Sequence, residues 1–314
     1  MTSRAATRDA GSIGEALAAV SLPTSSTTFP DGVRARIEIP SVEGPACLRA
    51  VLEEAEALDV PVRRLSQGTG VFLLSDRELD EMATDAAEAG LELSLFARPV
   101  TGWGISATAR APAGAGFAAT VQGNAGLRAA MDDITRAAAH GVRSVLISDV
   151  GLLELFARRR AAGDLPATMQ AKISVMLPIS NPATASVLVA LGANTLNLQT
   201  DLSLGEIAEI RQVVDVPLDI YVETPDNLGG FLRQHELSEL VRIAAPVYLK
   251  FGLRNAPDVY PAGSHLDSVT VALSRERVRR AALGLELMAR SGTELVTSKP
   301  GAEGLAVPEV RGSR

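Results

Sequence analysis

The sequence predicts an α/β protein in which eight parallel strands close into a (β/α)8 TIM barrel. Segments of alternating polarity, such as ARIEIPS at 35–41 and LDIYVE at 218–223, recur along the chain, and a helical pattern follows nearly every one. This alternation indicates a parallel sheet with crossover helices, and eight units favour closure over an open doubly wound sheet. The 314 residues also suit a single barrel, which typically needs about 250.

The predicted elements follow one another in pairs. Strands are expected at 34–40, 62–67, 91–97, 143–148, 168–176, 195–199, 217–223 and 247–251. The helices after them are expected at 45–58, 75–89, from about 124, 151–161, 182–191, 203–213, 228–242 and 268–290. Side-chain oxygens that can accept a hydrogen bond from a first helical turn predict N-caps at Ser75, Asn181, Ser203 and Ser268.

The two ends of the chain lack a sustained period. Residues 1–32 are rich in Ser, Thr, Ala and Gly and are expected to form a disordered leader, with one short helix near 13–20. Residues 295–314 are polar and contain glycine, and are expected to be a disordered tail. The barrel domain is therefore predicted to span 33–294.

Composition narrows the class of protein. The net charge of −7 and the lack of a basic run argue against a nucleic-acid partner. No apolar stretch approaches the ~18 residues of a membrane span, and the N-terminus lacks a signal-peptide pattern. Cys47 is the only cysteine, which excludes a disulfide, a cysteine-ligated zinc and an iron–sulfur cluster within one chain. We expect a cytoplasmic protein without a membrane partner, and a homo-oligomer is possible.

Two long segments follow the carboxyl ends of predicted strands, at about 98–123 and 252–267. Active sites of barrels are assembled from such loops. Trp103, flanked by glycines, fits two interpretations of the first loop. It is either an aromatic anchor on a movable lid or a plug in a disordered insertion.

Aliphatic strand faces should lie under the helices, so the polar faces should point to the barrel axis. The predicted inward set is Arg36, Glu38, Arg64, Ser66, Glu92, Ser94, Arg98, Ser144, Ser148, Lys172, Ser174, Asn197, Gln199, Asp219, Tyr221, Glu223, Tyr248 and Lys250. Its five cations and four anions nearly balance, as a buried network requires. Such a set can bind a small polar or anionic molecule and shift pKa values.

Four of these side chains are predicted to be catalytic. Glu38 and Glu223 are candidate general acids or bases, and Lys172 and Lys250 are candidate Schiff-base amines. Residues near the strand ends and loops are predicted to bind substrate: Arg64, Gln67, Arg98, Trp103, Ser148, Asp149, Asn197, Gln199, Tyr221 and His265. A buried network that only satisfies its own charges is the alternative.

Other features near the strand ends are less specific. Glu43 ends a turn after the first strand, and the glycines of QGTG at 67–70 would expose backbone N–H groups to a ligand. Carboxylates together with Asn197 and Gln199 could hold Mg²⁺ or Mn²⁺, although there is no dense carboxylate motif and no metal ligand is assigned.

The segment 145–210 carries a resemblance. Asp149-Val150-Gly151, Asn181, Leu191-Gly192 and the run from Asp201 to Ile207 stand at its turns and helix starts. In this order they resemble the peptidase U32 (collagenase-like) family. Thr200-Asp201 replaces that family's Arg-Glu, and its cysteines are missing near 223–227. The resemblance implies a divergent barrel protein with the label of a hydrolase, without the iron–sulfur cluster of some members, and it transfers no catalytic residues.

Two functions fit the sequence. The first is a cytoplasmic enzyme that acts on a small polar anionic metabolite at the carboxyl-terminal barrel mouth, by lyase, aldolase or hydrolase chemistry. The second is a non-catalytic barrel that binds a small molecule or serves as a partner subunit. A long loop beside charged groups at a barrel mouth favours the first.

Overall fold

Eight parallel strands form a closed barrel in the order β1 to β8, with β8 pairing back onto β1, in a computed structural model that describes residues 21–98 and 119–310. The strands are β1 (Ala35–Pro40), β2 (Val62–Ser66), β3 (Glu92–Phe96), β4 (Ser144–Ile147), β5 (Gln170–Ile173), β6 (Thr195–Asn197), β7 (Leu218–Glu223) and β8 (Val247–Phe251). The predicted (β/α)8 fold is confirmed.

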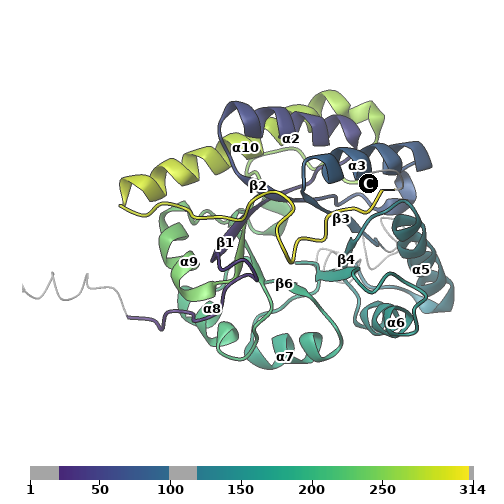
Figure 1. The fold of residues 1–314 in the computed structure, drawn as a ribbon, viewed down its shortest axis with the longest axis horizontal. Coiled ribbons are helices and arrows are strands. Elements are labelled where there is room, and N and C mark those ends of the chain that lie inside the picture. The colour runs from purple at the N-terminus through teal and green to yellow at the C-terminus, as the bar shows by residue number, and fades with distance from the viewer. Residues whose placement is uncertain (1–20, 99–118, 311–314) are drawn as a thin grey trace, which may run out of the picture.

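Helices surround the barrel, as Figure 1 shows. They are α2 (Pro45–Ala57), α3 (Asp76–Glu88), α5 (Gly123–Ala139), α6 (Val150–Ala161), α7 (Pro182–Ala190), α8 (Leu204–Arg211), α9 (Leu237–Ala244) and α10 (Asp267–Arg290). Short 3-10 turns lie at Val71–Leu73, Asp226–Leu228, Gln234–Glu236 and Ser264–Leu266.

Most predicted helix ends agree with the structure, with two exceptions. Ser75, Asn181 and Ser203 are N-caps whose side chains accept backbone N–H groups. Ser268 lies inside α10, whose N-cap position is Leu266, so that cap prediction is wrong. The helix expected from 228 begins only at Leu237, because the preceding residues form 3-10 turns and a bridge to the end of β7.

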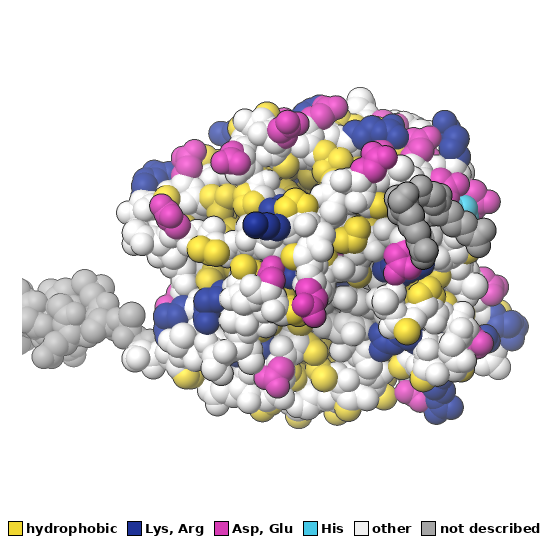
Figure 2. Space-filling view, in the orientation of Figure 1, with side chains coloured by type: hydrophobic (Ala, Val, Ile, Leu, Met, Phe, Trp, Pro, Cys, Tyr) yellow, Lys and Arg dark blue, Asp and Glu magenta, His cyan; other side chains and the backbone are white. Residues whose placement is uncertain are grey.

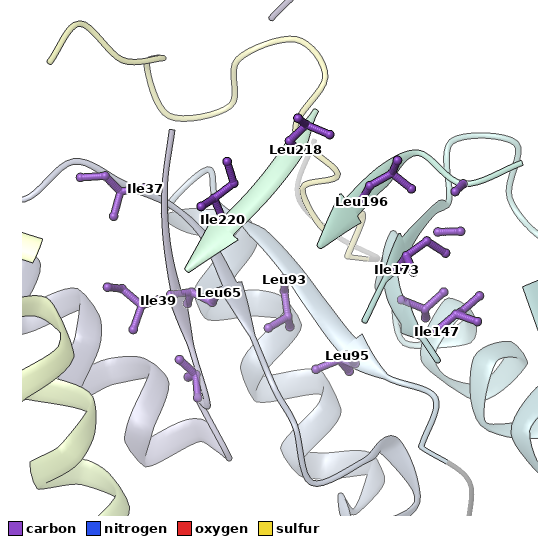
Figure 3. Packing of buried hydrophobic residues seen from close by; sticks show 14 of the residues in the cluster. Ile37, Ile39, Leu65, Leu93, Leu95, Ile147, Ile173, Leu196, Leu218 and Ile220 are labelled. Atoms are coloured by element: carbon purple, nitrogen blue, oxygen red, sulfur yellow. The ribbon is translucent and has the colours of Figure 1, made fainter. Parts of the chain in front are cut away.

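The hydrophobic core lies between the strands and the helices. Figure 3 shows aliphatic side chains from successive strands packed on the side that faces the helices. Ile37, Ile39, Leu65, Leu93 and Leu95 are fully buried there. Each such side chain contributes about 1.5–3 kcal/mol relative to exposure. Because these residues alternate with polar ones, the polar faces of the strands turn to the barrel axis.

Residues 295–310 are not a loose tail. They cross the amino-terminal end of the barrel, where the yellow segment runs in Figure 1. The N–H groups of Gly301 and Glu309 each donate to a carbonyl 2.8 Å away, on Gly90 and Gly141 respectively. These hydrogen bonds join backbone groups, so they cannot be predicted from the periodicity of side chains. The expectation of disorder is wrong for 295–310, and 311–314 lie outside the described residues.

The segment 21–32 also packs on the barrel. Ser25 N–H donates to the carbonyl of Arg242 in α9 at 3.0 Å. The buried Phe29 ring lies 5.2 Å from the ring of Tyr248, and the guanidinium of Arg36 stacks on it at 4.0 Å. The predicted disordered leader therefore does not hold for 21–32, while 1–20, with the expected short helix, lie outside the described residues.

The surface carries charges of both signs. On the face drawn in Figure 2, Lys and Arg side chains are interspersed with Asp and Glu. Among the described helices, none is both long and apolar enough to cross a membrane.

Candidate functional site

The strand register stacks the inward side chains in layers. Because the strands of a barrel tilt, side chains at one height come from alternate strands. One layer comes from β2, β4, β6 and β8, with Arg64, Ser144, Thr195 and Tyr248. The layer above it comes from the odd strands, with Glu38, Ser94, Lys172 and Asp219. The upper layer, toward the carboxyl ends, holds Ser66, Leu146, Asn197 and Lys250.

Glu38 is the hub of these layers. One carboxylate oxygen, Oε1, accepts from Ser66 Oγ at 2.6 Å and lies 3.1 Å from Lys250 Nζ. The other, Oε2, contacts Lys172 Nζ and lies 3.3 Å from Arg64 Nη1. Two lysines from strands far apart in the chain, β5 and β8, therefore share one carboxylate.

Two further carboxylates complete the network. Asp219 lies 2.8 Å from Lys172 Nζ and 2.9 Å from Arg64 Nη1. Glu92 lies 2.8 Å from Arg64 Nε and accepts from Ser144 Oγ at 2.9 Å. The guanidinium of Arg64 also stacks on the Tyr248 ring, 3.3 Å from its centroid. Three cations thus face three carboxylates, all buried, so the network carries no net charge.

Burial changes the proton affinities of this network. It lowers the pKa of Lys172 to about 8, because desolvation of the ammonium outweighs the attraction of Asp219 and Glu38. Burial pushes the pKa of Glu38 upward, but Lys172, Lys250 and Arg64 together outweigh it and hold that pKa well below its usual range. Glu38 is therefore ionised, and Lys172 has a neutral form within reach of physiological pH.

The use of lysine is selective in this chain. Of its 30 Lys and Arg residues only three are lysines, at positions 172, 250 and 299. Lys172 and Lys250 are buried in the barrel interior, and Lys299 is exposed. Arginine cannot lose its proton in proteins, whereas a buried lysine can. An arginine-rich chain that places two of three lysines on one carboxylate favours a chemical role for the amine.

Three side chains in these layers have buried polar atoms without a hydrogen-bond partner. They are Nδ2 and Oδ1 of Asn197, Oγ of Ser94 and Nη2 of Arg64, within 21–98 and 119–310. Leaving one buried donor or acceptor unpaired costs about 1–3 kcal/mol. Because Asn197 stands in the upper layer beside Lys250, a small molecule bound there would satisfy it.

Glu223 does not join this network. The pairing of β7 with β8 shifts between Tyr221 and Glu223, so that Glu223 pairs with the outward-facing Phe251. Its carboxylate accepts from Arg254 N–H at 2.9 Å and from Gln234 Nε2 at 3.3 Å, and Arg280 of α10 lies 3.7 Å away. The prediction that it faces the axis is wrong, because a register shift reverses the side-chain direction.

Three predicted binding residues lie at the rim beside β1, β2 and β3. Arg98 Nη1 donates to the carbonyl of Gly68 at 2.9 Å, and burial lowers the pKa of Arg98 to about 10. Gln67 and His265 line a cavity of about 310 Å³ together with Glu43. Glu43 accepts the N–H groups of Gly68 and Thr69, and burial raises its pKa. The QGTG turn therefore binds a carboxylate of the protein itself.

The remaining predicted binding residues are dispersed. Tyr221 faces the axis, with Lys250 Nζ 4.5 Å from its ring centroid. Ser148 Oγ donates to the carbonyl of Ala119 at 2.7 Å. Asp149 is occupied as the N-cap of α6 and as the acceptor of Val121 N–H. Gln199 lines a separate cavity of about 340 Å³ at the ends of β5 to β7. Trp103 and residues 99–118 of its loop, expected to be either a lid or a disordered insertion, lie outside the described residues.

No group of three or more His, Cys, Asp or Glu side chains among the described residues is arranged to hold a metal ion. The Mg²⁺ or Mn²⁺ expected as possible from the sequence stays a prediction. Asp219 and Ser94 belong to the expected inward set without a catalytic or binding role, and Asp219 is expected only as a partner of the lysines in a buried network. The signal that would have assigned Asp219 is the pairing of β6 with β7, which sets it beside Asn197 and Lys172.

Comparisons with known proteins bear on the middle of the chain. Residues 117–224 match the model of peptidase family U32. The resemblance expected from 145–210 is therefore confirmed within this segment. The U32-like segment contributes Lys172, Asn197 and Asp219, whereas Glu38 and Lys250 lie outside it.

Among solved structures, the U32 peptidase Mk0906 is 14% identical with a TM-score of 0.38, and the alignment covers 89% of each chain. CutC from Streptococcus agalactiae is 14% identical with a TM-score of 0.47, over 68% of this chain and 98% of that one. A chain of the tryptophan synthase complex from Pyrococcus furiosus is 12% identical with a TM-score of 0.46, over 82% and 99%. None of these values bears on activity. No curated protein matches this chain.

Proposed function

We propose that this chain is an enzyme that acts on a small anionic carbonyl compound at the carboxyl-terminal mouth of the barrel. Lys250 is the amine that meets the carbonyl group, in chemistry of the lyase or aldolase type. The observation that carries the proposal is the carboxylate of Glu38, shared by Lys250 in the upper layer and Lys172 beneath it. Cytoplasmic localisation, expected from the sequence, is part of this proposal.

The shared carboxylate provides a route for a proton. An amine attacks a carbonyl carbon only in its neutral form. Glu38 contacts both lysines, so it can pass the proton of Lys250 to the neutral form of Lys172, whose pKa is about 8. The neutral nitrogen of Lys250 then forms a bond to the carbonyl carbon. The carbonyl oxygen leaves as water with the two protons of that nitrogen, and a neutral imine remains.

The guanidinium of Arg98 at the rim of the barrel can contact the anionic group of the substrate. Arg98 follows β3 at the carboxyl end of the barrel and is buried. Its guanidinium lies near the Tyr260 ring, 5.4 Å from the centroid. Guanidinium groups bind carboxylates and phosphates through paired donors. We therefore assign Arg98 to the anionic group of the substrate.

The test is a retention experiment with a matched control. Purified protein is equilibrated with the small-molecule fraction of a cell extract, washed and denatured, and the retained compounds are identified by mass spectrometry. Wild type and Lys299→Met should retain the same anionic carbonyl compound, and Lys250→Met should lose it. Equal profiles for wild type and Lys250→Met, with both proteins folded, would contradict the proposal.

A non-catalytic barrel is the second candidate, and one observation favours it. Each of the three cations and three carboxylates of the network already has an oppositely charged partner. Under this alternative the network holds the architecture, so Lys250→Met should lower stability without changing the retained compounds.

A further inference from the structure

Asn197 restricts which compound the barrel mouth can bind. Its side chain is buried, and neither the nitrogen nor the oxygen has a partner within the described residues. A carboxamide presents donors on nitrogen and an acceptor on oxygen, next to each other. A ligand that satisfies both atoms must bring one acceptor and one donor. This requirement is the same for either orientation of the amide.

The neighbours of Asn197 add two conditions. Its layer is built from β2, β4, β6 and β8, so Asn197 of β6 stands between Leu146 and Lys250. Lys250 provides the reacting amine, and the side chain of Leu146 forms an apolar side of the site. Because Asn197 and Lys250 belong to one layer, we place the donor and acceptor close to the carbonyl carbon, on a short molecule with some exposed C–H surface.

Building on the proposed function, we infer that the substrate is a hydroxylated carbonyl compound, with a hydroxyl on the carbon next to the carbonyl group. Short aldoses, ketoses and hydroxy oxo acids belong to this class. The hydroxyl donates to Oδ1 of Asn197, and a second oxygen of the ligand accepts from Nδ2. A plain oxo acid offers only acceptors, so it would leave Oδ1 buried and unpaired. Sites that pair a substrate hydroxyl discriminate strongly against analogues that lack it.

Hydroxypyruvate and pyruvate form a matched pair of probes, because they differ by one hydroxyl group. Each is incubated with the protein and sodium cyanoborohydride, which reduces an imine to a stable secondary amine. Peptide mapping by mass spectrometry then assigns the adduct among the three lysines of the chain. We expect the adduct at Lys250 to form at least about tenfold faster with hydroxypyruvate than with pyruvate.

Variants assign this preference to Asn197. Asn197→Leu should bring the ratio of the two rates close to one, mainly by slowing the reaction of hydroxypyruvate. Asn124→Leu, at an exposed position of α5, should keep the wild-type ratio. If Asn197→Leu does not fold, the ratio in wild type decides alone. Equal rates in wild type overturn the inference and leave the proposed function intact, whereas no adduct at Lys250 with either compound overturns both.

Discussion

Lys250 Nζ lies 3.1 Å from Oε1 of Glu38, across the seam where the last strand of the barrel pairs with the first. The contact exists only when the barrel is closed. It joins the layer at the mouth to the network below, because the other oxygen of Glu38 contacts Lys172. Any change at Glu38 should therefore affect both the closure of the barrel and the reactivity of the amine.

Replacing Glu38 by Gln should destabilise the protein. The change leaves Lys172, Lys250 and Arg64 facing two carboxylates instead of three, all buried in the barrel interior. Breaking a buried ion pair in this way costs about 3–5 kcal/mol. Guanidinium unfolding measures the loss. The matched variant Glu286→Gln, on the exposed face of α10, should stay within about 0.5 kcal/mol of wild type. Equal stabilities of the two variants would contradict a coupled network.

The rate of imine formation should rise with pH through about 8, the pKa of Lys172. Below that value Lys172 is mostly protonated and cannot take the proton of Lys250, and each lower pH unit reduces its neutral fraction about tenfold. Above it the rate should level off. Trapping with hydroxypyruvate and cyanoborohydride over a pH series gives the profile. In Lys172→Met the rise through about 8 should disappear; an unchanged profile would show that Lys172 takes no part in the proton route.

Glu223→Gln should leave the rate of adduct formation at Lys250 unchanged within about twofold, because Glu223 lies outside the axial network. It should lower stability by about 1–3 kcal/mol, since its carboxylate accepts from Arg254 N–H and Gln234 Nε2. The rate of adduct formation and the midpoint of chemical denaturation can be measured on the same preparation. A large drop in the rate of adduct formation with unchanged stability would show that Glu223 takes part in the reaction.

The segment that crosses the amino-terminal end should stabilise the barrel through Arg36. This buried guanidinium donates to Ser298 Oγ at 2.6 Å and to the carbonyl of Glu303 at 2.8 Å. Ser298→Ala removes the first acceptor and should cost about 1–3 kcal/mol in thermal or chemical unfolding. Ser186→Ala, exposed on α7, serves as the control and should have little effect. If both variants match wild type, the hydrogen bond from Arg36 to Ser298 contributes nothing to stability.

Sequence patterns predicted the parts of this molecule that depend on alternation. Glu38, Lys172 and Lys250 alternate with aliphatic residues on single strands, so their inward direction followed from period two. The direction of Glu223 could not be predicted in this way, because a β-bulge depends on how two strands pair and is not visible in the sequence of one strand.

Residues 295–310 were missed for another reason. They bind through backbone groups, a few polar side chains and scattered apolar ones such as Leu295, Ala306 and Val310, and these contacts follow no period. The unpartnered amide of Asn197 was also invisible in the sequence, since the absence of a partner is known only when every neighbour has been placed.

A crystal structure of the protein after reaction with hydroxypyruvate and cyanoborohydride gives the most direct answer. Electron density should continue from Nζ of Lys250 into a three-carbon adduct whose hydroxyl lies within hydrogen-bond distance of the Asn197 carboxamide, with Glu38 still contacting Lys172. Density on Lys299 alone, or an unmodified Lys250, would show that the barrel mouth is not the reactive site.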